Sequence, residues 1–289
     1  MSSIQRAMER QRARRGQSPV PAGDEAQGGE HAGEEAVAPA ETEPRAPAPV
    51  SPDVELNLDY LRGRGMLTPG ADRRDLQEQY RLVKRRVITQ AFEGPTDAPN
   101  PGNLLQITSS LLDEGKTFTA FNLGMSISME VDFTVLLVDA DLTRRSLTNM
   151  IGLGDRPGLT EVLTGETSNV ADIVYRTSVP RLSVIPAGGD HPRATELIAS
   201  ADMRRLTREL ASRYSDRLVI FDSTPLLMDS QAATLALHMG QLLLVVEAGR
   251  TQEQAVREAV GLLESSSAAV GLLLNKGGRS HGYGYYGGY

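Results

Sequence analysis

The stretch LLQITSSLLDEGKTFTAFNLGMSI, residues 104–127, runs from an apolar segment through a polar loop into a helical pattern. Gly115, Lys116 and Thr117 stand where the loop becomes the helix. In such a strand, loop and helix, backbone N–H groups wrap a phosphate, lysine neutralises its charge, and Ser or Thr binds the metal. The strict pattern GxxxxGK[ST] is not met, because Ser110 replaces its first glycine. The stretch therefore favours a phosphate-binding loop (P-loop), with an ordinary strand-to-helix turn as the alternative.

Two acidic residues lie inside this loop. A carboxylate that faced a triphosphate would be repelled, so we expect Asp113 and Glu114 to point outward. If position 113 needs a left-handed backbone, Asp is among the less costly replacements for glycine there. The segment that we expect to contact ATP comprises Ser110, Asp113, Glu114, Gly115, Lys116, Thr117 and Phe118.

Acidic residues also follow two later apolar runs. VLLVDAD, residues 135–141, ends in Asp139 and Asp141, and LVIFDSTP, residues 218–225, contains Asp222. The carboxyl ends of neighbouring parallel strands meet at the crevice where ligands bind. Mg²⁺ prefers oxygen ligands and keeps several waters, so a threonine hydroxyl plus one or two carboxylates suffices. A lone Asp after a strand is as often a helix N-cap, but three in this order favour a site for ATP and Mg²⁺.

From residue 104 onward, short apolar runs alternate with helical patterns. This alternation is typical of a parallel sheet covered on both faces, so we predict a doubly wound, mostly parallel α/β domain over residues 99–276. We expect its ligands at the carboxyl ends of the strands. The predicted strands are 104–108, 134–140, 182–186, 218–222, 241–247 and 270–275, and the predicted helices lie near 117–130, 195–214, 228–239 and 251–265.

The chain on either side of this domain has a different composition. Residues 1–53 combine an arginine-rich start with a Pro/Ala/Glu/Gly stretch that has too little apolar surface to offset chain entropy, so we predict disorder. The basic start is interpreted as a solvated tail, with contact to anionic lipid or a partner as the alternative. Residues 277–289 are expected to form a flexible tail rich in glycine and tyrosine.

Residues 54–98 are predicted to form a helical segment. Leu76, Tyr80, Val83 and Val87 recur at steps of three and four, which predicts an amphipathic helix whose apolar face packs on another surface. The opposite face carries one charged stripe, made of Glu78, Arg81 and Lys84.

The bulk composition excludes several classes of function. With 289 residues, a net charge of −7 and a pI near 5.3, the chain lacks the clustered basic surface that nucleic-acid binding needs. It has no cysteine, so disulfides and thiolate zinc sites are impossible, and a reducing compartment fits. No apolar run approaches the ~18–20 residues that cross a bilayer, and the N-terminus lacks the apolar centre of a secretory signal. We expect a cytoplasmic protein.

The loop around Lys116, VLLVDAD and VIFDSTP together resemble the Walker A, A′ and B motifs of the bacterial tyrosine kinases of polysaccharide biosynthesis. The similarity covers residues 55–289. The sequences LTPGADRRDLQEQYRLVKR and DADLTRR most resemble those of the cytoplasmic autokinases of exosortase-type exopolysaccharide loci. The resemblance implies a MinD/ParA-like P-loop NTPase fold and ATP-dependent autophosphorylation in trans. The tyrosines that the resemblance implies as targets are Tyr283, Tyr285, Tyr286 and Tyr289.

The resemblance also implies individual roles in the active site. Lys116 would bind the β and γ phosphates, Thr117 with Asp141 and Asp222 would surround Mg²⁺, and Asp139 would lie near the attacking tyrosine hydroxyl. At the end of the last predicted strand, Asn275 and Lys276 sit where related ATPases contact the base, although a strand-end Asn is as often a turn residue.

The same family joins subunits into a ring through an E-x-x-R-x-x-R helix, a pattern that Glu78, Arg81 and Lys84 occupy. Lys84 replaces the last arginine, so the charge is retained while bidentate pairing is lost. Family members commonly need a membrane activator, either fused or separate. We expect a separate one here, a chain-length-determinant protein that recruits the chain to the inner face of the plasma membrane.

Several departures from the family pattern leave other functions open. Leu112 and Asp113 replace a usual Pro-Gly, Thr224 replaces the first proline of the B motif, and Leu111 stands where chromosome-partition relatives carry a second lysine. The lack of that lysine favours the kinase branch. The alternatives are a regulatory ATPase whose nucleotide state switches binding to a membrane partner, and a catalytically weak scaffold for the polysaccharide machinery.

Overall fold

The computed structural model of this chain describes residues 53–70, 72–95, 98–213 and 216–277. The predictions made for residues 1–52 and for 278–289, including the tyrosine cluster, lie outside these residues.

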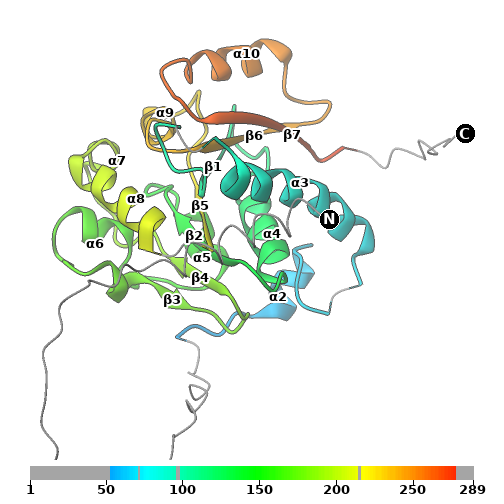
Figure 1. Cartoon of the computed structure of the whole chain (residues 1–289), viewed down its shortest axis with the longest axis horizontal. Coiled ribbons are helices and arrows are strands. Elements are labelled where there is room, and N and C mark those ends of the chain that lie inside the picture. Colours follow the sequence, from blue (N-terminus) through cyan, green and yellow to red (C-terminus); the bar gives the residue numbers. More distant parts are fainter. Residues whose placement is uncertain (1–52, 71, 96–97, 214–215, 278–289) are drawn as a thin grey trace, which may run out of the picture. The chain divides into compact units, whose positions relative to one another are not determined.

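A seven-stranded sheet forms the centre of the described residues, with strand order β3-β4-β2-β5-β1-β6-β7 (Figure 1). All neighbours pair in parallel except β3 and β4, which are antiparallel. The predicted mostly parallel class and all the predicted strands are confirmed, whereas β3 was missed because two residues are too few to leave a pattern. The strands are β1 (Leu104–Ser109), β2 (Thr134–Asp139), β3 (Tyr175–Arg176), β4 (Leu182–Ile185), β5 (Arg217–Asp222), β6 (Gln241–Glu247) and β7 (Ala269–Asn275).

The central strands are mostly apolar because helices cover both of their faces. Every residue of β1 is buried, and β2 and β5 are buried after their first residue. Pairing of β2 with β5 places Asp139 opposite Asp222, and pairing of β1 with β5 places Ile107 opposite Asp222. This register brings the acidic strand ends next to the loop that follows β1.

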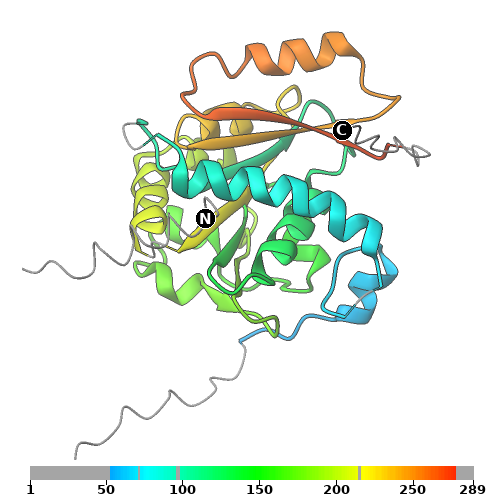
Figure 2. The same ribbon diagram turned by 45° about the vertical axis from the view of Figure 1, so that its right-hand side comes forward.

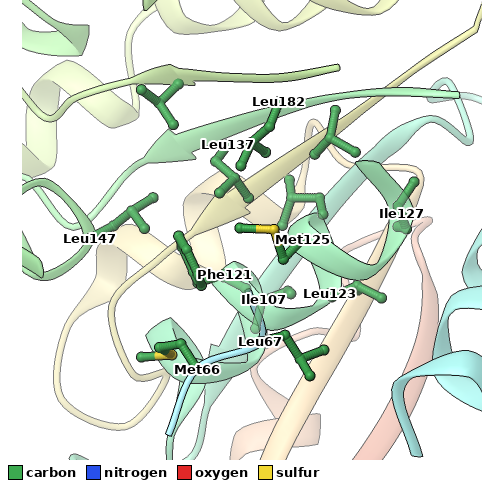
Figure 3. Packing of buried hydrophobic residues seen from close by; sticks show 14 of the residues in the cluster. Met66, Leu67, Ile107, Phe121, Leu123, Met125, Ile127, Leu137, Leu147 and Leu182 are labelled. Carbon is green, nitrogen blue, oxygen red and sulfur yellow. The ribbon is translucent and has the colours of Figure 1, made fainter. Parts of the chain in front are cut away.

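The helices α2, α3, α4 and α5 form one layer, and their side chains share a hydrophobic core with the sheet (Figure 2). Figure 3 shows Phe121 and Met125 of α4 beside Leu137 of β2, with Met66 and Leu67 next to them. The short helix α5 was not predicted, because one or two turns leave no readable period, whereas α2 lies within the predicted helical segment. These elements are α2 (Leu58–Gly63), α3 (Arg74–Glu93), α4 (Lys116–Ser128) and α5 (Ser146–Met150).

The other face of the sheet is covered by the later helices. The single helix predicted over 195–214 is two helices, and the Oγ of Ser200 between them accepts a 3.1 Å hydrogen bond from the N–H of Met203. A serine at this position caps a new helix, which explains the interruption. The short helices that precede these two in the chain were not predicted from the sequence. The elements are α6 (Leu159–Leu163), the 3₁₀ helix η1 (Val170–Ile173), α7 (Ala194–Ile198), α8 (Ala201–Arg213), α9 (Ser230–Ala236) and α10 (Glu253–Gly261).

The segment before β1 shares the core of the sheet. In α3, Tyr80 and Val87 are buried while Leu76 and Val83 pack against the same cluster, as the amphipathic pattern predicts. Among the helices that the structure describes, none is long and apolar enough to span a bilayer.

Candidate functional site

The loop between β1 and α4 has the backbone that a phosphate-binding loop requires. Gly115, the residue before α4, has φ 98°. A Cβ at Gly115 would lie 2.1 Å from Nδ2 of Asn275, so only glycine fits there. Asp113 has φ 64° and is exposed, which confirms both its outward orientation and the left-handed backbone considered for it.

Glu114 is the exception within this loop. Its side chain is 1% exposed, so the expectation of an outward-pointing carboxylate is wrong for Glu114. Oε2 accepts a 2.6 Å hydrogen bond from the N–H of Leu111, and Oε1 accepts one from the hydroxyl of Thr251. These donors compensate the buried charge. Thr251 was missed because nothing in the spacing links residue 251 to residue 114.

Lys116 begins α4 and points toward the acidic strand ends. It is 7% exposed, and its Nζ lies 4.0 Å from Oδ2 of Asp141. Burial raises the pKa of Asp222, and the charge of Lys116 offsets part of that rise. The structure therefore brings together the lysine and two of the carboxylates that the sequence predicted to share one site.

Asp139 is held by its own loop. Its Oδ2 accepts hydrogen bonds of 2.8 Å from both the N–H and the hydroxyl of Thr148, and its Oδ1 accepts one of 3.2 Å from the N–H of Asp141. Burial raises the pKa of Asp139 to about 6, and the neighbouring charge of Asp141 adds to this. Asp139 thus orders the loop after β2 as well as lying beside the predicted metal ligands. Thr148 was not singled out from the sequence.

Asp222 is the least compensated of these carboxylates. It is buried, and neither of its oxygens has a hydrogen-bond partner among the described residues. Burial first, and then the charge of Asp139, raises the pKa of Asp222 to about 8, while Lys116 and the hydroxyl of Thr117 lower it. Such a carboxylate is costly in the ligand-free protein, which points to a ligand that compensates it.

The oxygen atoms around this point suit a hard cation. Oδ2 of Asp141 and both carboxylate oxygens of Asp222 lack hydrogen-bond partners within the described part of the chain, and Thr117 adds a hydroxyl. Across those same residues, no group of three or more His, Cys, Asp or Glu could hold a metal by itself. The oxygen atoms of Asp141, Asp222 and Thr117 fit Mg²⁺, which takes few protein ligands and keeps waters and phosphate oxygens.

The remaining expected ATP contacts are distributed around the loop. Ser110 is buried, and Phe118 packs against the core below α4. Nδ2 of Asn275 donates a 2.8 Å hydrogen bond to the carbonyl of Glu114, and Nζ of Lys276 donates one of 2.5 Å to the carbonyl of Asp113. Both side chains therefore contact the main chain of the P-loop.

The residues expected at a subunit interface are divided. Glu78 and Arg81 form an exposed ion pair of 3.1 Å on α3. Lys84, whose side chain is 13% exposed, instead contacts Glu130 and the carbonyl of Ser126 in the same chain. The predicted charged stripe is therefore interrupted at Lys84, because Glu130 at the end of α4 attracts its ammonium group.

A parallel sheet, a glycine-lysine-threonine loop entering a helix, and buried aspartates at the adjoining strand ends define a P-loop nucleotide-binding protein. No family model matches the chain. The tyrosine-protein kinase CpsD of Streptococcus agalactiae is 34% identical over 190 residues, covering 64% of this chain and 81% of CpsD. The tyrosine-protein kinase YwqD of Bacillus subtilis is 30% identical over 213 residues, covering 73% of this chain and 86% of YwqD.

Further similarities include the succinoglycan biosynthesis transport protein ExoP of Rhizobium meliloti, 35% identical over 186 residues, which are 62% of this chain and 23% of ExoP. The kinase domain of the Escherichia coli tyrosine kinase ETK superimposes with a TM-score of 0.61 at 26% identity, covering 82% of this chain and 95% of that domain. The chain belongs to the bacterial tyrosine-protein kinases. The predicted family, fold class and enzyme class are confirmed.

Proposed function

We propose that this kinase transfers the γ-phosphate of Mg-ATP to tyrosines of its own C-terminal cluster, on a neighbouring subunit. The observation that carries the proposal is the convergence of Lys116, Asp141 and Asp222 next to the P-loop. The sequence supplies the acceptors, because four of its last seven residues are tyrosines.

Phosphoryl transfer requires an in-line nucleophile and neutralisation of charge on the phosphates. The tyrosine oxygen bonds to the γ-phosphorus while the bond to the β–γ bridging oxygen breaks, and ADP leaves. Lys116 and the loop amides neutralise the β and γ phosphates. Asp139, whose pKa is raised to about 6, takes the phenolic proton.

Mg²⁺ would be held by Thr117, Asp141 and Asp222, whose oxygen atoms match its preference. When bound, the ion neutralises charge on the β and γ phosphates.

Transfer between subunits requires an assembly. The exposed pair of Glu78 and Arg81 supports the proposal that α3 contributes to a ring. Lys84 joins that surface only if it leaves Glu130. A tyrosine on a glycine-rich tether then reaches a neighbouring active site at high effective concentration.

The biological role follows from the relatives. ExoP is named for succinoglycan biosynthesis and transport, and we place this chain in the regulation of exopolysaccharide synthesis or export on that similarity. A separate chain-length-determinant protein of the membrane would activate it at the inner face of the plasma membrane, and the kinase itself would be cytoplasmic.

Mixing two altered chains tests whether the tyrosines are phosphorylated and whether the phosphate passes from one subunit to another. The Lys116→Met chain keeps the tyrosines, and a chain ending at Gly282 keeps the active site. With Mg-ATP, neither should label alone, whereas the mixture should carry phosphotyrosine on the Lys116→Met chain. The control is Arg257→Met, which removes an exposed ion pair on α10 and should label as the unaltered chain does.

Other outcomes would assign another function. ATP hydrolysis without phosphotyrosine, with and without the candidate membrane protein, would indicate a regulatory switch. Nucleotide binding without any turnover would indicate a scaffold.

A further inference from the structure

The end of β7 contacts the P-loop from behind, although the two are far apart in sequence. Asn275 donates to the carbonyl of Glu114 at 2.8 Å, and Lys276 donates to the carbonyl of Asp113 at 2.5 Å. Both acceptors are main-chain atoms of the loop that receives the phosphates.

Holding these carbonyls determines where the adjoining amides point. In a planar trans peptide the C=O and the N–H point in opposite directions. A carbonyl of Asp113 fixed toward Lys276 turns the N–H of Glu114 the other way. In the same way, the hydrogen bond from Asn275 to the carbonyl of Glu114 turns the N–H of Gly115 away from Asn275. The amides turned away from β7 are the donors that a P-loop offers to phosphate.

The two donors are themselves held in place. Lys276 has φ 55° and forms a 3.1 Å ion pair with Glu247, which also pairs with Arg250 at 3.0 Å. The N–H of Glu247 donates to Thr251 at 3.2 Å, and the Thr251 hydroxyl donates to Glu114. The loop after β6 and the end of β7 therefore form one hydrogen-bonded support behind the P-loop.

We propose that Lys276 and Asn275 are positioning residues that aim the amides of Glu114 and Gly115 at the nucleotide phosphates. This assignment rests on the proposed ATP-binding function of the loop. It gives Asn275 a role different from contact with the base, because its donor is directed to the loop main chain.

Equilibrium binding of ADP, ATP and adenosine to the full chain tests this role without requiring kinase activity. Lys276→Met removes the donor, Lys276→Arg retains a charged donor, and Asn275→Leu removes a neutral donor without altering charge. We expect ADP and ATP to bind about tenfold more weakly to Lys276→Met and to Asn275→Leu, because each variant misdirects one phosphate donor. Lys276→Arg should bind within about threefold of the unaltered chain.

Binding of adenosine, which has the base but no phosphates, distinguishes a role in aiming the loop amides from a direct contact with the base. Measured by displacement of a fluorescent ADP analogue, its affinity should stay within about twofold in every variant. Arg257→Met, which removes an exposed pair on α10, is the matched control and should bind all ligands normally. Melting temperatures of the Lys276 variants and the unaltered chain without nucleotide should agree within about 2 °C, because Lys276 is exposed.

Two results would overturn the proposal. One is unchanged ADP and ATP affinity in Lys276→Met. The other is an equal loss of adenosine and ADP affinity in Asn275→Leu, which would indicate a base contact. If ADP binding responds as expected while phosphotyrosine is never formed, the positioning role stands and the autokinase function fails.

Discussion

Asp139 and Asp222 lie opposite each other at the ends of two neighbouring parallel strands. Asp139 receives hydrogen bonds from Thr148 and from the N–H of Asp141, whereas the oxygens of Asp222 receive none from the residues that the structure describes. The strand register thus places one compensated and one uncompensated carboxylate side by side at the nucleotide site.

Asp222→Asn should stabilise the ligand-free protein and abolish binding of Mg-ADP. The folded-state pKa of Asp222 is raised from 3.8 to about 8, so the folded protein holds a proton that the unfolded chain releases. The free energy of unfolding therefore falls as pH rises between these values, and the asparagine variant escapes that loss. The gain should be at least about 1 kcal/mol above pH 8 and smaller at pH 5.

Urea unfolding at both pH values, with Mg-ADP titrations beside it, measures these effects. Equal stability of the variant and the unaltered chain at pH 8.5 would show that Asp222 is compensated by some other group.

Lys116→Met should weaken nucleotide binding at least about 100-fold, because a charged donor to the phosphates is lost. It should also destabilise the ligand-free fold by about 1–3 kcal/mol, since Asp141 and Asp222 lose a nearby buried cation. Calorimetric titration with ADP and chemical unfolding measure the two effects separately. Arg62→Met, which removes an exposed pair with Asp59, is the control and should change neither.

Glu114→Ala should lower the free energy of unfolding by about 1–3 kcal/mol, because the N–H of Leu111 and the hydroxyl of Thr251 both lose their acceptor. Glu114→Gln keeps an acceptor oxygen and should lose less. Denaturation curves of the two variants in the absence of nucleotide provide the comparison. An alanine variant as stable as the unaltered chain would mean that water replaces the carboxylate at no cost.

Substitutions on α3 should separate assembly from folding. Glu78→Ala with Arg81→Ala removes an exposed pair and should dissociate any ring while changing stability by less than about 0.5 kcal/mol. Lys84→Met breaks the contact with Glu130 inside the chain and should lower stability by up to about 1 kcal/mol. Sedimentation velocity measures the assembly of both variants, and thermal unfolding measures their stability. If the doubly substituted chain still forms a ring, α3 does not contribute to the interface.

The sequence by itself determined the layout of the nucleotide-binding fold. Buried parallel strands such as β1 and β5 are mostly apolar on both faces, so the sheet could be predicted from short apolar runs. The order of the P-loop, Asp139, Asp141 and Asp222 then predicted that these residues lie close together, since parallel strands bring their carboxyl ends to one edge of the sheet. Short elements such as β3 and α5 escaped prediction because they span too few residues to show a repeating pattern.

Only the tertiary structure decided which partner each polar side chain takes. Glu114 is buried against Thr251, Lys84 turns to Glu130, and Asn275 reaches the carbonyl of Glu114. These partners are distant in sequence and are selected by the packing of elements, which no local period encodes. Spacing along the chain therefore predicts Lys116 as a phosphate ligand, whereas the contacts that hold its loop come from the distant strands β6 and β7.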